Sequence, residues 1–241
     1  MIEITKGICN VSIAPMRADS SDKSEIVSQL LYGESADIIE VKDNWTKIIT
    51  HYDNYEAWMD TKQISPVTEE FLKSRKINLI KEAFQSAMAE NGRTLLSIGS
   101  EVTFETTSPT RGENLSESIV NCAKEFLNVP YLWGGKSFFG IDCSGFTQII
   151  YKIHGIKIPR DTYQQAEIGE VLTFIEEAKP GDLAFFENPE GRIHHVGIIL
   201  ADQKIIHAHG KVRIDSLDSS GIFNKDQNRH THKLRFIRSY F

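Results

Sequence analysis

One linker-like stretch, Thr106-Thr107-Ser108-Pro109-Thr110-Arg111-Gly112, separates two parts of the chain with different residue patterns. Before it, short apolar stretches alternate with polar turns through the first 65 residues, a spacing typical of a small antiparallel barrel. After it, helical patterns come first and short β-rich stretches follow. A chain of 241 residues has room for two small domains. The pattern therefore predicts an α+β protein with an N-terminal β-barrel.

The expected elements follow from the same patterns. In the barrel, strands are expected at 2–11, 25–31, 35–41, 45–50 and 55–59, with Asp and Asn in the turns. Thr68 with two following glutamates predicts a helix cap, and the apolar spacing extends this helix over 69–90, before a strand at 95–104. We assign 1–66 to the barrel, 67–112 to a connecting helix, strand and linker, and 113–241 to the second domain.

In the second domain, Asn114 or Ser116 caps a helix that runs through Leu127. A second helix is expected from Cys143 to about His154, where Gly155 would end it. The strands predicted after it lie at 184–186, 196–200, 204–207 and 212–217.

Charge and composition exclude several classes of function. The 27 basic residues are outnumbered by 33 acidic ones, and no stripe of Lys and Arg is dense enough for a phosphate backbone, so we expect no nucleic-acid partner. No apolar run approaches the length of a membrane span. The N-terminus lacks the basic and apolar segments of a secretory signal. We therefore expect a cytoplasmic protein without a membrane partner, in which three cysteines form no disulfide framework.

The strongest candidate for chemistry is Cys143. Asp142 precedes it at the expected helix N-cap, after a loop rich in glycine. A thiol in the first turn of a helix experiences the positive end of the helix dipole, which favours the nucleophilic thiolate. Cys9 and Cys122 lie in apolar patterns and are expected to be buried small hydrophobes.

A cysteine nucleophile needs a base and a group that orients the base. His194 and His195 enter a strand, so they point to opposite faces and only one of them can face Cys143. Alternation places His195 with Gly197 and Ile199 but does not decide which face holds the site. His207 and His209 follow at the end of the next strand and are candidates for the orienting group.

Six short motifs follow one another in this part of the chain. They are Tyr131-Leu132-Trp133-Gly134-Gly135, Asp142-Cys143-Ser144-Gly145, Pro159-Arg160-Asp161-Thr162-Tyr163, Pro180-Gly181-Asp182, His195-Val196-Gly197-Ile198 and Ile206-His207-Ala208. Together they make the chain look like the NlpC-type cell-wall cysteine peptidases across roughly residues 113–215, in the order and spacing of that family's motifs. The family's fold is papain-like, with the cysteine on a helix packed against a small antiparallel sheet.

The resemblance implies roles for individual residues. It makes Cys143 the nucleophile, His195 the base and His207 the residue that orients His195. Tyr131 would donate its hydroxyl to the oxyanion, together with the Cys143 amide. Further candidate substrate contacts are Asp142, Ser144, Trp133, Arg160 and Asp161. Trp133 equally suits core packing, and for Arg160 and Asp161 a turn cap is favoured over substrate contact.

The N-terminal barrel resembles the bacterial SH3-like domains that accompany a subset of these peptidases. In that subset the barrel limits the substrate to peptides with a free N-terminal L-alanine, and the enzymes cleave the γ-D-glutamyl bond to the diamino acid of murein stem peptides. The resemblance implies that Asp142, Tyr55 and, as the acidic residue of the barrel, Glu34 hold the substrate ammonium. Blocking that ammonium would leave buried charges unpaired.

The expected function is thus a cytoplasmic γ-D-glutamyl-L-diamino acid endopeptidase that takes murein stem peptides, requires no cofactor and acts in recycling or turnover. Two alternatives use the same residues: an acyltransferase or thioesterase on the same core, and a catalytically inert module that binds cell wall. His194/His195, His207/His209 and His230/His232 suggest imidazole ligands, but a zinc hydrolase is disfavoured. The sequence has no His-Glu-x-x-His motif, and His207 and His209 point the same way without an evident third ligand. His209 and the pair near the C-terminus are expected to face solvent.

Overall fold

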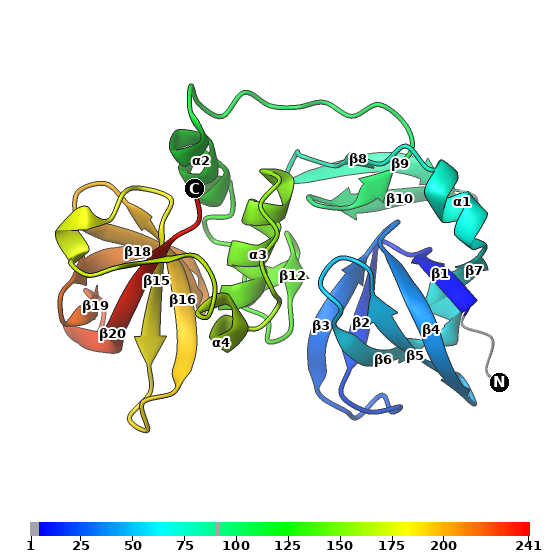
Figure 1. The fold of residues 1–241 in the computed structure, drawn as a ribbon, viewed down its shortest axis with the longest axis horizontal. Coiled ribbons are helices and arrows are strands. Elements are labelled where there is room, and N and C mark those ends of the chain that lie inside the picture. Colours follow the sequence, from blue (N-terminus) through cyan, green and yellow to red (C-terminus); the bar gives the residue numbers. More distant parts are fainter. Residues whose placement is uncertain (1–4, 90–91) are drawn as a thin grey trace. The chain divides into compact units, whose positions relative to one another are not determined.

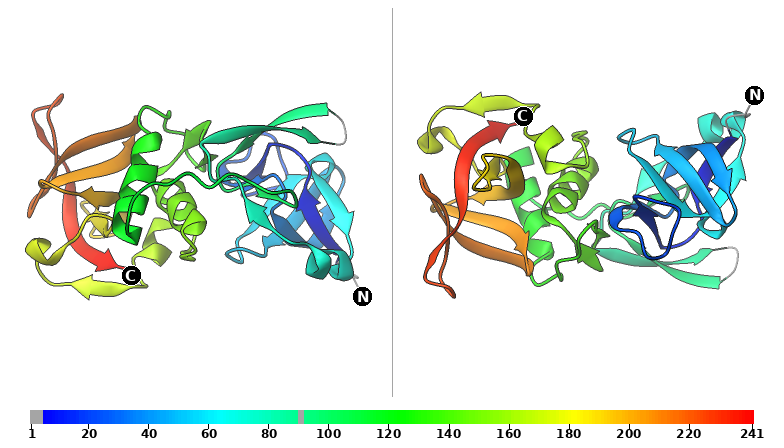
Figure 2. Two further views of the ribbon diagram at one scale, coloured as in Figure 1. Left: turned by 90° about the horizontal axis from the view of Figure 1, so that it is seen from above. Right: turned by 90° about the horizontal axis from the view of Figure 1, so that it is seen from below.

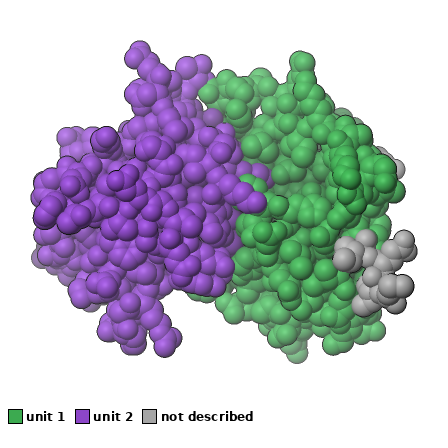
Figure 3. Space-filling model, viewed as in Figure 1, with its two compact units in different colours: residues 1–109, 132–140 green, residues 110–131, 141–241 purple. Residues whose placement is uncertain are grey.

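The chain forms two compact units in a computed structural model that describes residues 5–89 and 92–241. Unit 1 comprises residues up to 109 together with 132–140, and unit 2 comprises 110–131 and 141–241 (Figures 1 and 3). None of the helices within the described ranges is long and apolar enough to cross a membrane.

Unit 1 contains the predicted barrel. Its seven-stranded antiparallel sheet has the order β3-β2-β6-β5-β4-β1-β7. Side chains alternate between buried and half-buried along β5, so one face of the sheet fills the barrel core. The strands are β1 Thr5–Cys9, β2 Ile13–Arg17, β3 Ile26–Leu31, β4 Ser35–Lys42, β5 Trp45–Thr50, β6 Glu56–Asp60 and β7 Ile64–Val67, with a 3-10 turn at Thr61–Gln63 before β7. Strands β2 and β7 were not predicted, because Pro15 and Pro66 interrupt their short apolar patterns.

The predicted helix over 69–90 is wrong for most of its length. The cap at Thr68 is present, but the helix that it begins, α1, spans only Glu69–Ser74. The chain then forms β8 (Asn78–Leu79) and a hairpin of β9 (Phe84–Ala89) with β10 (Gly92–Ser97). Phe84 and Met88, which supported the helical spacing, are exposed on one face of β9, so the actual period is two. The predicted end of the helix, at residues 90 and 91, lies outside the described residues.

The predicted strand at 95–104 is also interrupted. Strand β10 stops at Ser97, and β11 (Glu101–Val102) pairs with β8 after a turn in which Gly99 has a φ of +84°. Leu96 and Val102 nevertheless enter one small core together with Ile80. This core, rather than a long helix, holds the segment after the barrel.

Unit 2 packs three helices against a second antiparallel sheet. Its sheet has the order β14-β20-β15-β16-β17-β18-β19, and a further pairing of β19 with β20 closes it into a barrel. Figures 1 and 2 show the helices on one side of this sheet. The elements are α2 Leu115–Glu125, α3 Cys143–Ile153, α4 Thr162–Gln165, β14 Glu170–Leu172, β15 Leu183–Glu187, β16 Ile193–Leu200, β17 Lys204–His209, β18 Lys211–Asp218, β19 Gly221–Asn224 and β20 Arg229–Ser239, with a 3-10 turn at Ile175–Glu177.

The predicted α+β class and both predicted helices of this part are confirmed. The Asn114 side chain accepts a hydrogen bond from the Glu117 amide and caps α2. Asp142 caps α3 in the same way, and Gly155 follows the end of α3 with a φ of +79°, a conformation that glycine adopts without strain.

The segment 132–140 leaves the second part of the chain and packs on unit 1. It carries β12 (Lys136–Ser137), and β13 (Gly140–Ile141) begins at its end. The Lys136 amide donates to Gln29 Oε1 at 2.8 Å, and the Phe138 amide donates to Ser97 Oγ at 2.9 Å. The sequence places Tyr131 on one side of this loop and Cys143 on the other, so unit 1 holds the segment that joins two candidate catalytic residues.

Candidate active site

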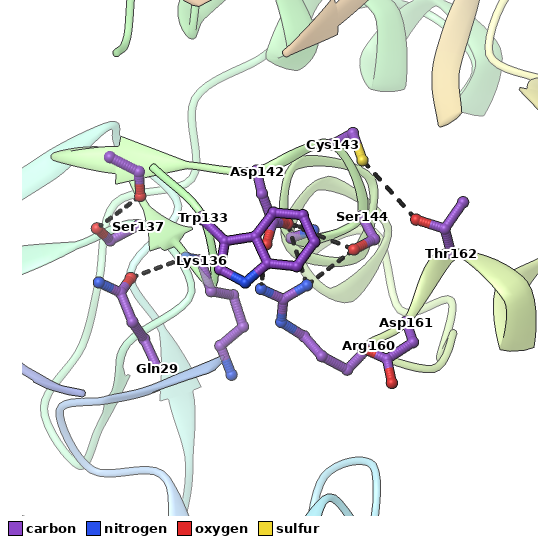
Figure 4. A network of polar contacts seen from close by, with 12 residues as sticks. Gln29, Trp133, Lys136, Ser137, Asp142, Cys143, Ser144, Arg160, Asp161 and Thr162 are labelled. Carbon is purple, nitrogen blue, oxygen red and sulfur yellow. Dashed lines mark hydrogen bonds and ion pairs between the residues drawn. The ribbon is translucent and has the colours of Figure 1, made fainter. Parts of the chain in front are cut away.

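Cys143 begins helix α3, and its thiol is buried. The side chain of Asp142 accepts a hydrogen bond from the Gly145 amide at 2.7 Å and fixes the start of the helix. Cys143 Sγ lies 3.7 Å from Thr162 Oγ1 at the start of α4, as Figure 4 shows. The helix packs on β16, where the Val196 amide also donates to the thiol. The nucleophile candidate is therefore held next to the strand that carries His195.

Burial raises the pKa of the Cys143 thiol to about 11, and the nearby Asp142 carboxylate adds to the rise. Hydrogen bonds from Thr162 and the Val196 amide, and the charge of Arg160, lower the pKa by less. The expectation that the helix terminus would favour a thiolate is thus wrong for the resting protein. The thiol is protonated at neutral pH and needs a base at the moment of attack.

This pKa predicts how Cys143 reacts with iodoacetamide. Because only the thiolate is alkylated, we expect the rate of Cys143 modification to rise about tenfold per pH unit between pH 7 and pH 10. Mass spectrometry of the Cys143 peptide after timed exposure measures the rate, with free cysteine as the reference thiol. A rate that levels off near neutral pH would show a resting thiolate and contradict the assignment.

A line of hydrogen bonds runs away from the candidate base. His195 Nε2 lies 2.8 Å from His207 Nδ1, and His207 Nε2 lies 3.0 Å from Asp215 Oδ2. All three side chains are buried, whereas His194 is exposed. Gly197 leaves room for this arrangement, because a Cβ there would lie 2.9 Å from His207 Cβ. The structure thus places His195 and His207 in direct contact, and their roles as base and orienting residue stay predictions.

The pKa of His195 lies well below its ordinary value. Burial is the main cause, and the neighbouring His207 and His232 add to it because a second positive charge there is unfavourable. His195 is therefore a neutral imidazole at neutral pH, the state in which it can accept a proton from a thiol.

His232 corrects the expectation that the histidines near the C-terminus face solvent. It is only 7% exposed, and its ring stacks on His195 with the centroids 4.2 Å apart. Strand β20, which carries it, was not predicted because charged residues fill its outward positions. His209 is half-buried, and His230 is exposed and pairs with Asp218. Among the described residues, no group of three or more His, Cys, Asp or Glu side chains is arranged to hold a metal ion.

A buried ion pair lies beside the nucleophile. Arg160 Nη1 donates to Asp142 Oδ1 at 3.0 Å, and Arg160 Nη2 donates to Asp142 Oδ2 at 2.6 Å (Figure 4). The same guanidinium donates to Ser144 Oγ at 2.8 Å. Arg160 is 2% exposed, so it is a structural partner of Asp142 and not a surface turn residue. Contacts of Asp142, Ser144 and Arg160 with substrate stay predictions.

The other two candidates in unit 2 are Tyr131 and Asp161, which precede Asp142 and follow Arg160 in the sequence. Tyr131 is half-buried and pairs through its backbone with Ile141, the residue before Asp142. Burial raises the pKa of the Tyr131 phenol, and the charges of Cys143 and Asp142 raise it further, so it stays a hydrogen-bond donor. Asp161 occupies the N-cap of α4, and its amide donates to Gln164 Oε1.

Three candidate residues belong to unit 1. Glu34 is buried, accepts from the Leu31 amide and pairs with Lys136 Nζ at 2.9 Å. Tyr55 is half-buried against the barrel core. Trp133 is 61% exposed and donates to Glu25 Oε1, so its core-packing alternative is wrong. Their joint action with Asp142 on a substrate ammonium stays a prediction.

Sequence reasoning missed three residues around these candidates. Asp215 and Lys136 are the buried partners of His207 and Glu34, and Thr162 is the neighbour of the thiol. Asp215 had little signal, because alternation places it on the same face of β18 as Lys211, Arg213 and Leu217. Lys136 had none, since its glycine-rich loop gives no indication of what it contacts.

Comparisons with known proteins agree with this geometry. Residues 128–231 match the NlpC/P60 family, and residues 16–64 match the bacterial dipeptidyl-peptidase SH3 domain. The chain is 29% identical to a γ-D-glutamyl-L-lysine dipeptidyl-peptidase of Bacillus cereus, over 83% of this chain and 73% of that protein. It is 26% identical to dipeptidyl-peptidase 6 of Lysinibacillus sphaericus, over 86% of this chain and 89% of that protein.

The fold is similar to that of a solved NlpC/P60 family protein from Bacillus cereus. That comparison covers 98% of this chain and 99% of the other, with a TM-score of 0.81 at 22% sequence identity.

Proposed function

Because the chain joins a bacterial dipeptidyl-peptidase SH3 domain to an NlpC/P60 domain, it is a hydrolase of the cysteine peptidase type, and we propose that it cleaves the γ-D-glutamyl bond to the L-diamino acid in murein stem peptides. The observation that carries the proposal is the buried line from His195 through His207 to Asp215, on a sheet against which the helix that begins with Cys143 packs. The similarity to the γ-D-glutamyl-L-lysine dipeptidyl-peptidase of Bacillus cereus supports the choice of bond.

The reaction proceeds in two halves on Cys143. In the first, His195 takes the thiol proton as sulfur attacks the γ-carbonyl carbon, and the Cys143 amide with the Tyr131 hydroxyl stabilises the oxyanion. The carbon–nitrogen bond then breaks, and His195 returns the proton to the leaving amine. In the second half, His195 takes a proton from water as it attacks the thioester, and the released thiolate regains that proton.

The preferred substrate carries a free N-terminal L-alanine. A substrate ammonium needs carboxylate partners once it is removed from water, and Asp142 and Glu34 are the buried carboxylates proposed for it. Asp142 already forms an ion pair with Arg160, and Glu34 already forms one with Lys136. The substrate ammonium would therefore add a second cation to each carboxylate. A requirement for a free amine would limit the enzyme to detached peptides, which is our reason for proposing a role in recycling or turnover.

Cleavage of a matched pair of peptides tests this proposal. We expect L-Ala-γ-D-Glu-L-Lys to be cleaved at least about 100-fold faster than its N-acetylated form, because acetylation leaves the ammonium partners unpaired. Chromatography of the released L-Ala-D-Glu dipeptide gives kcat/KM for each. The diaminopimelate peptide, run beside the lysine peptide, reports the preference at the third residue.

The outcomes separate the parts of the proposal. Equal cleavage of the free and acetylated peptides would refute the requirement for a free amine. Cleavage of none of them would refute the substrate class.

A further inference from the structure

The line of hydrogen bonds from His195 through His207 reaches Asp215, a residue to which no comparison assigns a role. Asp215 lies on β18, and its carboxylate is 2% exposed. Its Oδ2 faces His207 Nε2, and its Oδ1 accepts from Arg213 Nη2 at 2.8 Å. Arg213 also pairs with Asp226 at 2.8 Å. The carboxylate is therefore fixed in place on both of its oxygens.

We propose that Asp215 is a positioning residue that sets the tautomer of His207 and, through it, the tautomer of His195, so that Nδ1 of His195 is the nitrogen that takes the Cys143 proton. This inference rests on the proposed cysteine peptidase function and adds to it the residue that fixes the tautomers of the two histidines.

The first step of the argument concerns Asp215 and His207. Although burial alone would raise the pKa of Asp215, hydrogen bonds from His207 and Arg213 hold it below its ordinary value, so the carboxylate is ionised. An ionised carboxylate only accepts hydrogen bonds, and His207 Nε2 must therefore carry a proton. Burial lowers the pKa of His207 and keeps it neutral, so its Nδ1 carries none.

The second step passes this restriction to His195. A bare His207 Nδ1 is an acceptor, and His195 Nε2 at 2.8 Å must supply the proton between them. The opposite tautomer of His195 would set two lone pairs against each other at that distance inside a buried site. With its single proton on Nε2, neutral His195 has its free lone pair on Nδ1.

Other titratable groups surround His195 and His207 without changing which of their nitrogens carry protons. His194 and His209 flank it on β16 and β17, Arg213 lies on β18, and His232 stacks on His195 from β20. Among these groups, Arg213 contacts both carboxylate oxygens of Asp215, with Nη2 on Oδ1 and Nε 2.7 Å from Oδ2, and His232 contacts the face of the His195 ring. Neither contact competes for the proton between His195 and His207.

The decisive measurement is the tautomer itself. In protein with ¹⁵N-labelled histidine, NMR should show Nε2–H on both His195 and His207 near neutral pH. Asp215→Asn removes the carboxylate that requires a proton on His207 Nε2, so we expect the Nδ1–H tautomer to become populated in both rings. An unchanged His195 tautomer in this variant would overturn the proposal. This readout needs no substrate, so it is independent of the peptide assigned above.

The second test measures kcat/KM, with a control variant on the same strand. Removing a hydrogen-bond partner that orients a functional histidine typically lowers activity about 10- to 100-fold. We expect a loss of that size in kcat/KM for Asp215→Asn. Asp218→Asn, an exposed change on β18, should leave kcat/KM within twofold. In a His207→Leu background, Asp215→Asn should cost less than twofold, because the connection to His195 is already broken.

A purely structural role predicts a different pattern. In that case Asp215→Asn lowers kcat/KM by the same factor in both backgrounds, and that result would refute the proposal. If Asp215→Asn does not fold, Asp215→Ser serves for the same NMR measurement, with the His195 Nε2–H population expected to fall below that of the unaltered protein. An unaltered population there would equally overturn it.

Discussion

Replacing Cys143 by alanine should lower kcat/KM by more than about 10⁴-fold, to the limit of detection, while the protein stays folded. Cys143 begins the helix that packs on the strand of His195, and alanine removes only the sulfur from its side chain. Release of L-Ala-D-Glu from the lysine peptide measures the loss, and the melting temperature reports the fold.

Cys122→Ala is the matched control. Cys122 is buried on α2, not on the helix that Cys143 begins, so it lacks the location of the proposed nucleophile. We expect kcat/KM within threefold of the unaltered protein, with a modest loss of stability from the lost packing. Activity that survives in Cys143→Ala, or disappears in a well-folded Cys122→Ala, would show that the wrong thiol was chosen.

The parts of the fold that could be predicted are those with local signals. Asp142 and Asn114 cap helices through their own side chains, so the starts of α3 and α2 are visible in the sequence. The region after Thr68 has a local signal only for the start of α1, which Thr68 caps as predicted. The apolar spacing over 80–88 fits a helix or a strand. The pairing of β9 with β10 decides between them, and a pairing partner is not a local property.

The same distinction separates the predicted from the unpredicted parts of the site. Cys143, His195 and His207 lie in recognisable motifs, and the structure places the two histidines in direct contact. The ionisation of the thiol could not be predicted, because it depends on burial by α4 and β16 as well as on the helix terminus. His232 comes from a strand rich in charged residues, and only the closure of the sheet brings it onto the His195 ring.

The second large effect is expected for Arg160→Met, which should destabilise unit 2 by about 3–5 kcal/mol. The change keeps an unbranched side chain but removes both hydrogen bonds to Asp142 and the one to Ser144. Asp142 is 7% exposed, so its carboxylate would stay buried without the cation that compensates it. Denaturant unfolding of the unit 2 transition measures the loss.

A second substitution shows whether the lost pairing is the cause. Asp142→Asn removes the charge but keeps a good N-cap for α3, so Arg160→Met combined with Asp142→Asn should recover at least about 1 kcal/mol relative to Arg160→Met alone. Arg192→Met, at an exposed turn of the β15–β16 hairpin, should change stability by less than about 0.5 kcal/mol. If the double variant is as unstable as the sum of its single changes, the cost comes from packing around the Arg160 side chain and not from the charge left on Asp142. Recovery in the double variant would instead assign to Arg160 the role of neutralising the carboxylate that fixes the start of the nucleophile helix.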